Sequence, residues 1–234
     1  YTTPTNVKSL NYAKTITSTI QGQVSGTNLL TNPENANAAG WTKSLLSTTL
    51  DNTLAPDNTQ TADKLISTTG TGEHYAYRNY TLTAFETFDT STVTFDSGTE
   101  TFDTGSASGD TQTYTSSIFF KAGGYDAVRF MVSLDENLAT RKRVLFDLNL
   151  SNGTIGSLFA APGITVDAYG AVPFGNGWYR AYITVTFSFG ISQLRVQMYP
   201  NGAFSYAGND SNGIYIWGLK LNLGALDPYT AVSG

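Results

Sequence analysis

Short apolar segments that alternate with polar residues and end in turns run through most of this 234-residue chain, and they constrain its fold more than any other feature. In AVRFMVSL the alternation places two sets of side chains on opposite faces of a strand: Val128, Phe130 and Val132 against Arg129, Met131 and Ser133. Gly-Gly, Asn-Gly and Pro-Asp-Asn turns separate such segments, which recur at intervals of about 10–15 residues. Because no long amphipathic helix interrupts them, we expect an all-β antiparallel sandwich and exclude a βαβ fold.

The composition narrows the classes of function. Charged residues make up only 13% of the chain, against about a quarter in an average domain, and Thr, Ser, Asn and Gly replace them. A net charge of −5 gives no electrostatic reason to bind nucleic acid or an anionic membrane, and no apolar run is long enough for a transmembrane helix. Since there is no cysteine, disulfides, zinc–thiolate sites and thiol catalysis are excluded.

Three regions of the chain differ in character. Residues 1–27 carry two lysines and no acid, so we expect a docking arm, with a first strand of the main domain as the alternative. Residues 28–234 hold the strand pattern and form the expected main domain. Within it, residues 83–112 repeat a T-F-D-[TS] unit every seven residues and carry six acids and no base, which predicts an inserted β-rich extension.

The acidic repeat leaves two interpretations open. One is an acidic surface loop anchored by its phenylalanines. The other is a Ca²⁺ site built from the aspartate of each repeat, Asp89, Asp96 and Asp103. Calcium requires about six to eight oxygen ligands that converge in space, and this spacing does not by itself bring carboxylates together. We therefore expect no cofactor, with Ca²⁺ as a weak alternative.

Four residues are candidates for ligand binding. Tyr75 and Tyr77 fall on one face of the segment EHYAYRNYTL, with His74 on the other. Trp178 and Arg180 follow an Asn-Gly turn in GNGWYR, where the indole can cap the sandwich and the guanidinium can stack on a ring or pair with a carboxylate. Flat aromatic faces beside orienting polar groups are typical of saccharide sites, but for the tryptophan we expect a core role, with ligand binding as the alternative. His74, the single histidine, predicts a hydrogen-bonded strand residue rather than a catalytic base.

The segment GIYIWGLKLNL near the C-terminus is apolar on both faces. Strict alternation would divide it into two sets: Tyr215, Trp217 and Leu219 against Ile214, Ile216 and Gly218. This pattern predicts a central strand, buried on both sides, that closes the sandwich. Gly218 would let a ring or backbone approach closely.

Several segments, in the same order along the chain, resemble a large group of bacteriophage virion-surface jelly-roll domains that are similar to carbohydrate-binding modules. The matching segments cover most of residues 28–234 and are NLLTNPE, APDNTQTADKLI, YTSSIFFKAG, FDLNLSNGTIG, GNGWYRAYITV and YIWGLKLNLGALDPYT. The usual closing strand has Gln and Glu where this chain has Lys220 and Asn222, and the 83–112 block departs from the pattern.

The resemblance implies a non-catalytic structural protein of the virion surface, such as a fibre, spike or capsid-decoration module with a lectin-like jelly roll. Such a protein would be assembled in the host cytoplasm, and its expected partners are other virion proteins and copies of itself, as a homotrimer. A carbohydrate-binding receptor module of a tail fibre is the alternative, and a polysaccharide depolymerase is a further one. The sequence has no nucleophile elbow and no phosphate-binding loop, so no catalytic residue is expected.

Overall fold

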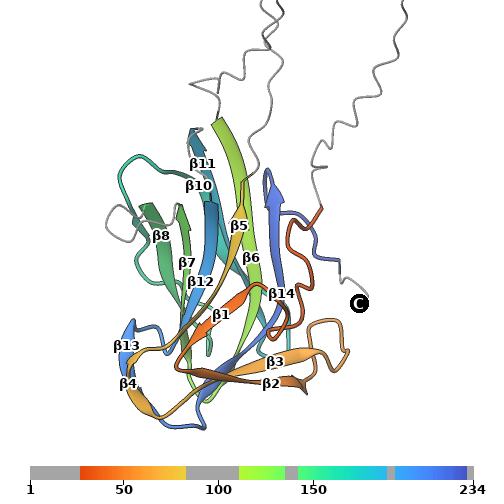
Figure 1. Ribbon diagram of the computed structural model, residues 1–234. Helices are drawn as coiled ribbons and strands as arrows, with labels where there is room; N and C mark the ends of the chain where they lie inside the picture. The colour runs from red at the N-terminus through yellow and green to blue at the C-terminus, as the bar shows by residue number, and fades with distance from the viewer. Residues whose placement is uncertain (1–26, 83–110, 135–141, 189–192, 231–234) are drawn as a thin grey trace, which may run out of the picture.

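The computed structural model describes residues 27–82, 111–134, 142–188 and 193–230, which fold into antiparallel β-sheets (Figure 1). Sheet A has the strand order β1-β5-β12-β7-β8-β9, and sheet B has the order β10-β11-β6-β14-β3-β2. A separate two-stranded ribbon pairs β4 with β13. The strands are β1 (Trp41–Ser44), β2 (Leu46–Thr53), β3 (Ala62–Ser67), β4 (Gly70–Glu73), β5 (Tyr75–Thr81), β6 (Thr111–Gly123), β7 (Ala127–Leu134), β8 (Lys142–Asn149), β9 (Phe159–Ala160), β10 (Thr165–Pro173), β11 (Tyr179–Ser188), β12 (Gln193–Pro200), β13 (Ser205–Gly208) and β14 (Gly213–Leu223).

The two sheets pack face to face around one apolar core. Phe120 of β6 meets Phe130 of β7 with 5.8 Å between ring centroids, and Phe130 meets Phe146 of β8 at 5.9 Å. Val128 and Val132 are fully buried in the same core, so the alternation predicted for this strand is confirmed. The described residues contain no α-helix, and the expected all-β antiparallel sandwich is confirmed.

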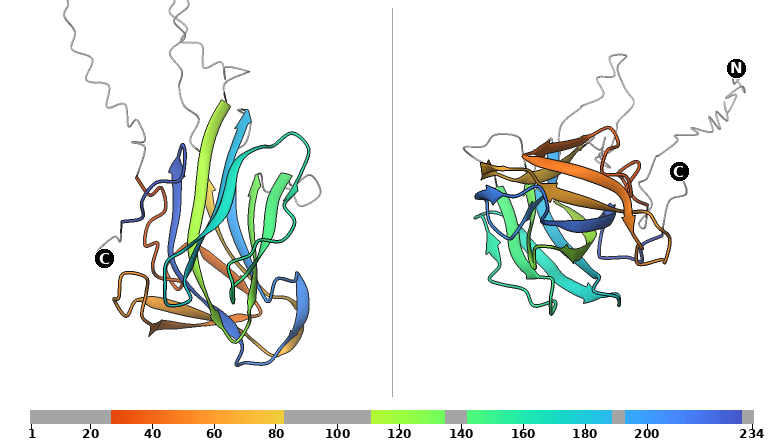
Figure 2. Two further views of the ribbon diagram at one scale, coloured as in Figure 1. Left: turned by 180° about the vertical axis from the view of Figure 1, so that it is seen from behind. Right: turned by 90° about the horizontal axis from the view of Figure 1, so that it is seen from below.

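Several connections carry the chain from one sheet to the other. The Gly-Gly turn that ends β6 leads into β7, and these strands belong to different sheets. Gly124 has a φ of +116°, and an added Cβ there would lie 2.7 Å from Asn212 Oδ1, so only glycine fits this crossing. Figure 2 shows the strands of the two sheets from behind and from below. These crossings agree with a jelly roll, and the jelly-roll assignment stays a prediction.

The closing strand β14 lies at the centre of sheet B, between β6 and β3. Its residues are buried on both faces, as predicted, but a register shift between Trp217 and Lys220 interrupts the alternation. Gly218 occupies this bulge with a φ of +61°, so the chain turns there and Leu219 faces the inter-sheet core. The prediction that Leu219 shares a face with Trp217 is therefore wrong.

The opening segment of the described domain packs beside the closing strand. Leu29 N donates to Leu221 O at 2.8 Å, and Leu219 N donates to Pro33 O at 3.1 Å. The pairing of β14 with β3 ends at Ile216, so residues 28–33 supply backbone partners on that side beyond the bulge. This arrangement brings the two ends of the domain together.

The single histidine, His74, lies between β4 of the two-stranded ribbon and β5 of sheet A. His74 is fully buried, and its ring stacks on Tyr206 with 4.3 Å between centroids. Its Nδ1 and Nε2 lie 3.0 Å and 3.1 Å from the carbonyl oxygens of Gly72 and Thr68. The histidine therefore has hydrogen-bonding partners next to a strand end, as expected.

Two regions singled out by the sequence fall largely outside the described residues. Of the expected docking arm, residues 1–27, only Thr27 is described. Of the expected insertion, residues 83–112, only the last two residues are described, as the start of β6. The Ca²⁺ candidates Asp89, Asp96 and Asp103 also lie outside the described residues.

Candidate functional site

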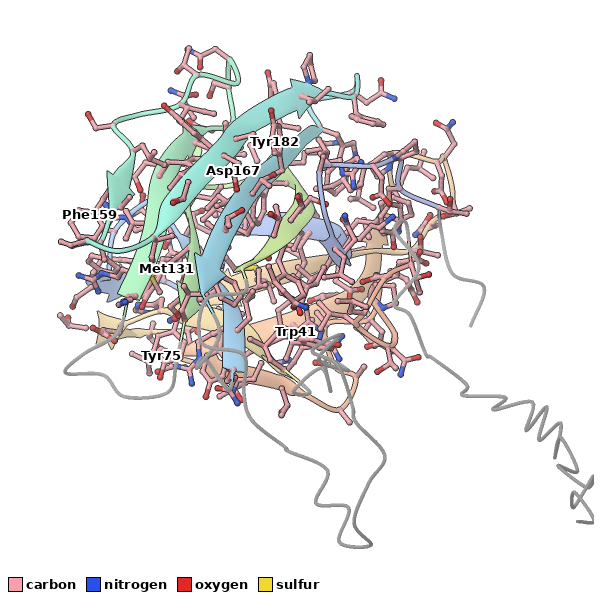
Figure 3. All side chains as sticks on the ribbon, turned by 90° about the horizontal axis from the view of Figure 1, so that it is seen from above. Trp41, Tyr75, Met131, Phe159, Asp167 and Tyr182 are labelled. Carbon is pink, nitrogen blue, oxygen red and sulfur yellow. The ribbon has the colours of Figure 1, made fainter. Side chains whose placement is uncertain are left out.

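The outer face of sheet A, called face A below, is built by four neighbouring strands, β5, β12, β7 and β8. Every second residue of these strands points away from the core, and the antiparallel registers align these residues in three rows across the sheet. The first row contains Asn79, Arg195, Ser133 and Arg143, the second Tyr77, Gln197, Met131, Leu145 and Phe159, and the third Tyr75, Tyr199, Arg129 and Asp147. Figure 3 labels Tyr75, Met131 and Phe159 from this face, and Tyr182 on a strand of the other sheet.

One end of face A is a cluster of tyrosines with a guanidinium. Tyr75 and Tyr77 stack with 5.9 Å between ring centroids, and Tyr75 also meets Tyr199 edge to face at 5.7 Å. The guanidinium carbon of Arg195 lies 4.0 Å from the Tyr77 ring centroid, while its Nε donates to Asn79 Oδ1 at 2.8 Å. The two predicted tyrosines are thus brought together, and the arginine is held flat over one of them.

The other end of face A is organised by Phe204, which follows β12. The Phe204 ring packs edge-on against Tyr199 at 4.9 Å. The guanidinium carbons of Arg129 and Arg143 lie 4.2 Å and 5.6 Å from its centroid. Asp147 binds Arg129 through two hydrogen bonds, of 2.7 Å and 2.9 Å, and this pairing raises the pKa of the arginine.

Within these three rows, two buried polar atoms have no hydrogen-bond partner among the described residues. They are Ser133 Oγ in the first row and Gln197 Oε1 in the second. Gln197 Nε2 donates to Tyr199 Oη at 2.7 Å, so within this side chain only the carbonyl oxygen lacks a partner among the described residues. A buried polar atom without a partner costs about 1–3 kcal/mol, and because Ser133 and Gln197 are only 0% and 2% exposed, neither atom is presented to a ligand at the surface.

The charges on face A oppose the charge of the whole protein. Among its described residues, face A has the guanidinium groups of Arg129, Arg143 and Arg195 and the single carboxylate of Asp147. The whole chain carries a net charge of −5. Face A is therefore a locally cationic surface on an acidic protein.

The remaining two candidates, Trp178 and Arg180, lie on the outer face of sheet B, called face B below. Both are almost fully buried, at 2% and 3% exposure. Trp178 Nε1 donates to Leu54 O at 3.1 Å, and the Arg180 guanidinium carbon lies 5.6 Å from the Phe119 ring centroid. The four predicted residues therefore do not form one site, because the sandwich separates the two tyrosines from this pair.

Residues 224–230, called the C-terminal cover below, bury the centre of face B. Arg180 Nη1 donates to Asp227 O at 2.7 Å, and Lys220 Nζ lies 2.7 Å from Asp227 Oδ1. Tyr229 packs on Trp217 with 4.8 Å between centroids. Burial lowers the pKa of Arg180 and raises the pKa of Tyr229. The indole of Trp178 packs in a buried cluster with Phe119 and Trp217 on the outside of sheet B. Ligand binding by Trp178 or Arg180 stays a prediction.

Sequence reasoning missed most of the residues that complete face A. Arg195 and Gln197 alternate with apolar residues in LRVQMYP, a signal that could have placed them on one face. Arg143 belongs to the basic run RKR, which on its own favours a solvated hairpin tip, yet its guanidinium lies over Phe159 and Phe204. No local pattern marks Phe204, because it reaches the sheet from a turn after β12.

Neither a cluster of metal-binding side chains nor a membrane-spanning helix occurs among the described residues. No group of three or more His, Asp or Glu side chains is placed to hold a metal ion in that part of the chain. No helix within the same ranges is long and apolar enough to cross a membrane.

Comparisons with known proteins give little beyond the structure itself. No protein-family model matches the chain, and no curated protein matches it. Among solved structures, it is similar to a "putative sugar binding protein" from Bacteroides thetaiotaomicron, with 10% identity and a TM-score of 0.37. That similarity covers 86% of this chain and 95% of the other. A likeness this distant carries no argument about function, so the proposals below are based on face A and on the sequence resemblance.

Proposed function

We propose that this chain is a non-catalytic carbohydrate-binding module of a bacteriophage virion surface and that face A is its recognition surface. The observation that carries the binding role is the arrangement of stacked Tyr75 and Tyr77 beside an ordered guanidinium. Sugar rings pack on aromatic faces and are oriented by a few polar groups, and face A supplies both. The virion setting depends on the order of segments in residues 28–234 that resemble virion-surface jelly rolls.

The burial of face B supports the choice of face A. On face B, Trp217 and Arg180 contact the C-terminal cover, so neither of these side chains is free to bind a ligand. On face A, Tyr75 and Tyr77 are half-buried and no described segment lies across them in the same way. A saccharide could therefore reach the tyrosines without displacing part of the described domain.

A glycan array followed by titration calorimetry tests the proposal. The wild type should bind at least one oligosaccharide at or below millimolar concentration, and Tyr77→Ala should remove that binding. The matched control is Tyr182→Ala, which deletes a tyrosine from face B and should leave binding unchanged. Mass spectrometry of the bound oligosaccharide should find it intact, because the module is non-catalytic. Absence of any saccharide binding, or equal binding by Tyr77→Ala, would overturn the proposal.

A second candidate function is a structural subunit that associates with copies of itself. Leu54, Val172 and Phe174 are apolar and 54%, 40% and 46% exposed. Phe174 packs edge to face on Phe119, and the backbone carbonyl of Leu54 accepts a hydrogen bond from Trp178, so two of these exposed residues adjoin one buried cluster. Exposed apolar groups that adjoin one another favour a protein interface. Native mass spectrometry should show a homotrimer that Phe174→Ser weakens, and a purely monomeric wild type at micromolar concentration would exclude this function.

A further inference from the structure

We infer that face A is selective for saccharides that carry carboxylates, in particular an oligosaccharide with a uronic acid at alternate residues. This inference depends on the proposed function and names its ligand class. The first step is charge: among its described residues, face A presents three guanidinium groups and one carboxylate, on a chain of net charge −5. A neutral saccharide would gain nothing from this local excess of positive charge, whereas an acidic one would.

The second step is the availability of the guanidinium groups. Arg129 is already paired with Asp147 through both of its forked nitrogens. Arg195 uses only Nε, toward Asn79, and its two Nη atoms have no hydrogen bond to a described residue. The Arg143 side chain contacts rings but makes no hydrogen bond or ion pair within the described ranges. The guanidinium groups of Arg195 and Arg143 are thus held in place by aromatic rings and keep free N–H donors. A carboxylate is the anion that matches the planar fork of donors in a guanidinium group.

The third step is spacing. Arg195 and Arg143 stand in the same row of face A, on strands β12 and β8, with Ser133 of β7 between them. Two strand spacings separate their backbones by about 10 Å, which is comparable to the length of a disaccharide. An oligosaccharide laid along this row could therefore place one carboxylate at each arginine.

One pair on face A already joins a carboxylate to a guanidinium group in the way that we infer for the ligand. The Asp147 carboxylate occupies the fork of Arg129 on the same face, in the row that also holds Tyr75 and Tyr199. Its side chain is 44% exposed while that of Arg129 is 18% exposed, so the pair forms at the surface of face A rather than in the core. A uronate at Arg143 or Arg195 would repeat this geometry with the carboxylate supplied by the ligand.

Titration calorimetry with two matched probes tests the inference on the full chain. The first probe is an oligosaccharide of alternating glucuronate and N-acetylglucosamine, and the second is the same oligosaccharide with its carboxyl groups reduced to alcohols. The acidic probe should bind about tenfold tighter or better, and raising the salt concentration should narrow the gap. Equal affinity for both probes would overturn the inference and leave the proposed function standing, whereas no binding to any saccharide of the array would overturn both.

Variants on face A locate the effect. Arg143→Gln and Arg195→Gln should each weaken the acidic probe by about fivefold to tenfold and leave any binding of the reduced probe unchanged. Arg195→Lys keeps the charge but loses the fork, so it should also weaken the acidic probe. Lys121→Gln is the matched control, because it removes one charge from face B and should change nothing. Thermal unfolding verifies that each variant is folded.

Two further outcomes would contradict the inference. If dextran sulfate binds tighter than the uronate probe at equal charge, face A responds to negative charge rather than to carboxylates. If Lys121→Gln weakens the acidic probe as much as the face A variants do, the attraction comes from the overall charge and not from Arg143 and Arg195.

Discussion

Faces A and B of the sandwich are built from the same kinds of side chain, yet they differ in how those side chains are used. On face B, Arg180 donates to Asp227 O and to Ser117 Oγ, and Trp217 Nε1 donates to Thr61 Oγ1 at 3.0 Å. On face A, Arg195 and Arg143 lie over rings and keep N–H donors that bond to no described residue. Aromatic and arginine content alone therefore does not identify a binding face.

The difference between the two faces is produced by the C-terminal cover. Gly218 makes the bulge that lets Tyr229 pack over the strand, because an added Cβ would lie 2.8 Å from Tyr229 Cζ. Tyr229 Oη then donates to Glu34 at 2.9 Å, which ties the cover to the start of the domain. Face B is thereby converted into a second small core, while no described segment covers face A in this way.

The largest expected effect distinguishes the two faces by stability. Trp217→Ala removes a buried ring from face B and should lower the free energy of unfolding by about 3–5 kcal/mol. Tyr77→Ala, on face A, removes a half-buried ring and should cost about 1 kcal/mol or less. Urea unfolding of both variants checks this, and a similar cost for the two would show that face A is as structural as face B.

A smaller effect should follow from the bulge glycine. Gly218→Ala places a Cβ against Tyr229 at a φ of +61° and should cost about 2–3 kcal/mol. Gly224→Ala is the matched control, since its φ is +77° and nothing lies within 4 Å, so only the backbone cost of about 1 kcal/mol remains. Equal losses in thermal unfolding would mean that the cover is not tightly packed at Gly218.

Two serines at equivalent places on the two faces should respond differently. Ser117 Oγ accepts from Arg180 at 2.9 Å in a buried position, so Ser117→Ala should cost about 1–2 kcal/mol. Ser133→Ala removes a buried hydroxyl with no partner among the described residues, so it should be neutral within about 0.5 kcal/mol or slightly stabilising. A clear loss of stability in Ser133→Ala would reveal a partner for this hydroxyl.

The smallest effect at neutral pH is expected at Tyr229, whose hydrogen bond to Glu34 contributes about 1 kcal/mol. Burial raises its pKa above the ordinary value, and the Glu34 carboxylate adds to the shift. The neutral form is therefore favoured in the folded state, so the associated stability is full below about pH 10 and is lost as the pH rises further. In urea titrations above that pH, Tyr229→Phe should lose stability less steeply than the wild type, and identical slopes would contradict a buried Tyr229.

Alternation in the sequence predicted which residues of a strand share a face, because side chains in extended backbone must alternate. It placed Arg129, Met131 and Ser133 opposite Val128, and it placed Tyr75 with Tyr77, as the structure shows. The alternation failed to place Leu219, because the sequence does not show that Gly218, within the same strand, adopts a positive φ.

The candidate site itself could not be assembled from the sequence. Arg195 and Asn79 are hydrogen-bonded across 116 residues, and no local pattern specifies that pairing. The separation of Trp178 and Arg180 from the tyrosines was likewise hidden, since it depends on which sheet each strand joins. Long-range strand order therefore decided which predicted residues meet.

The central claim, that face A and not face B recognises the ligand, is tested most directly by mapping backbone amide chemical shifts during titration with the glucuronate oligosaccharide. The account predicts that the shifts concentrate in β5, β12, β7 and β8, with Tyr77, Arg195 and Arg143 among the most affected. Shifts concentrated in β6, β14 and residues 224–230, or no shifts at millimolar oligosaccharide, would contradict it.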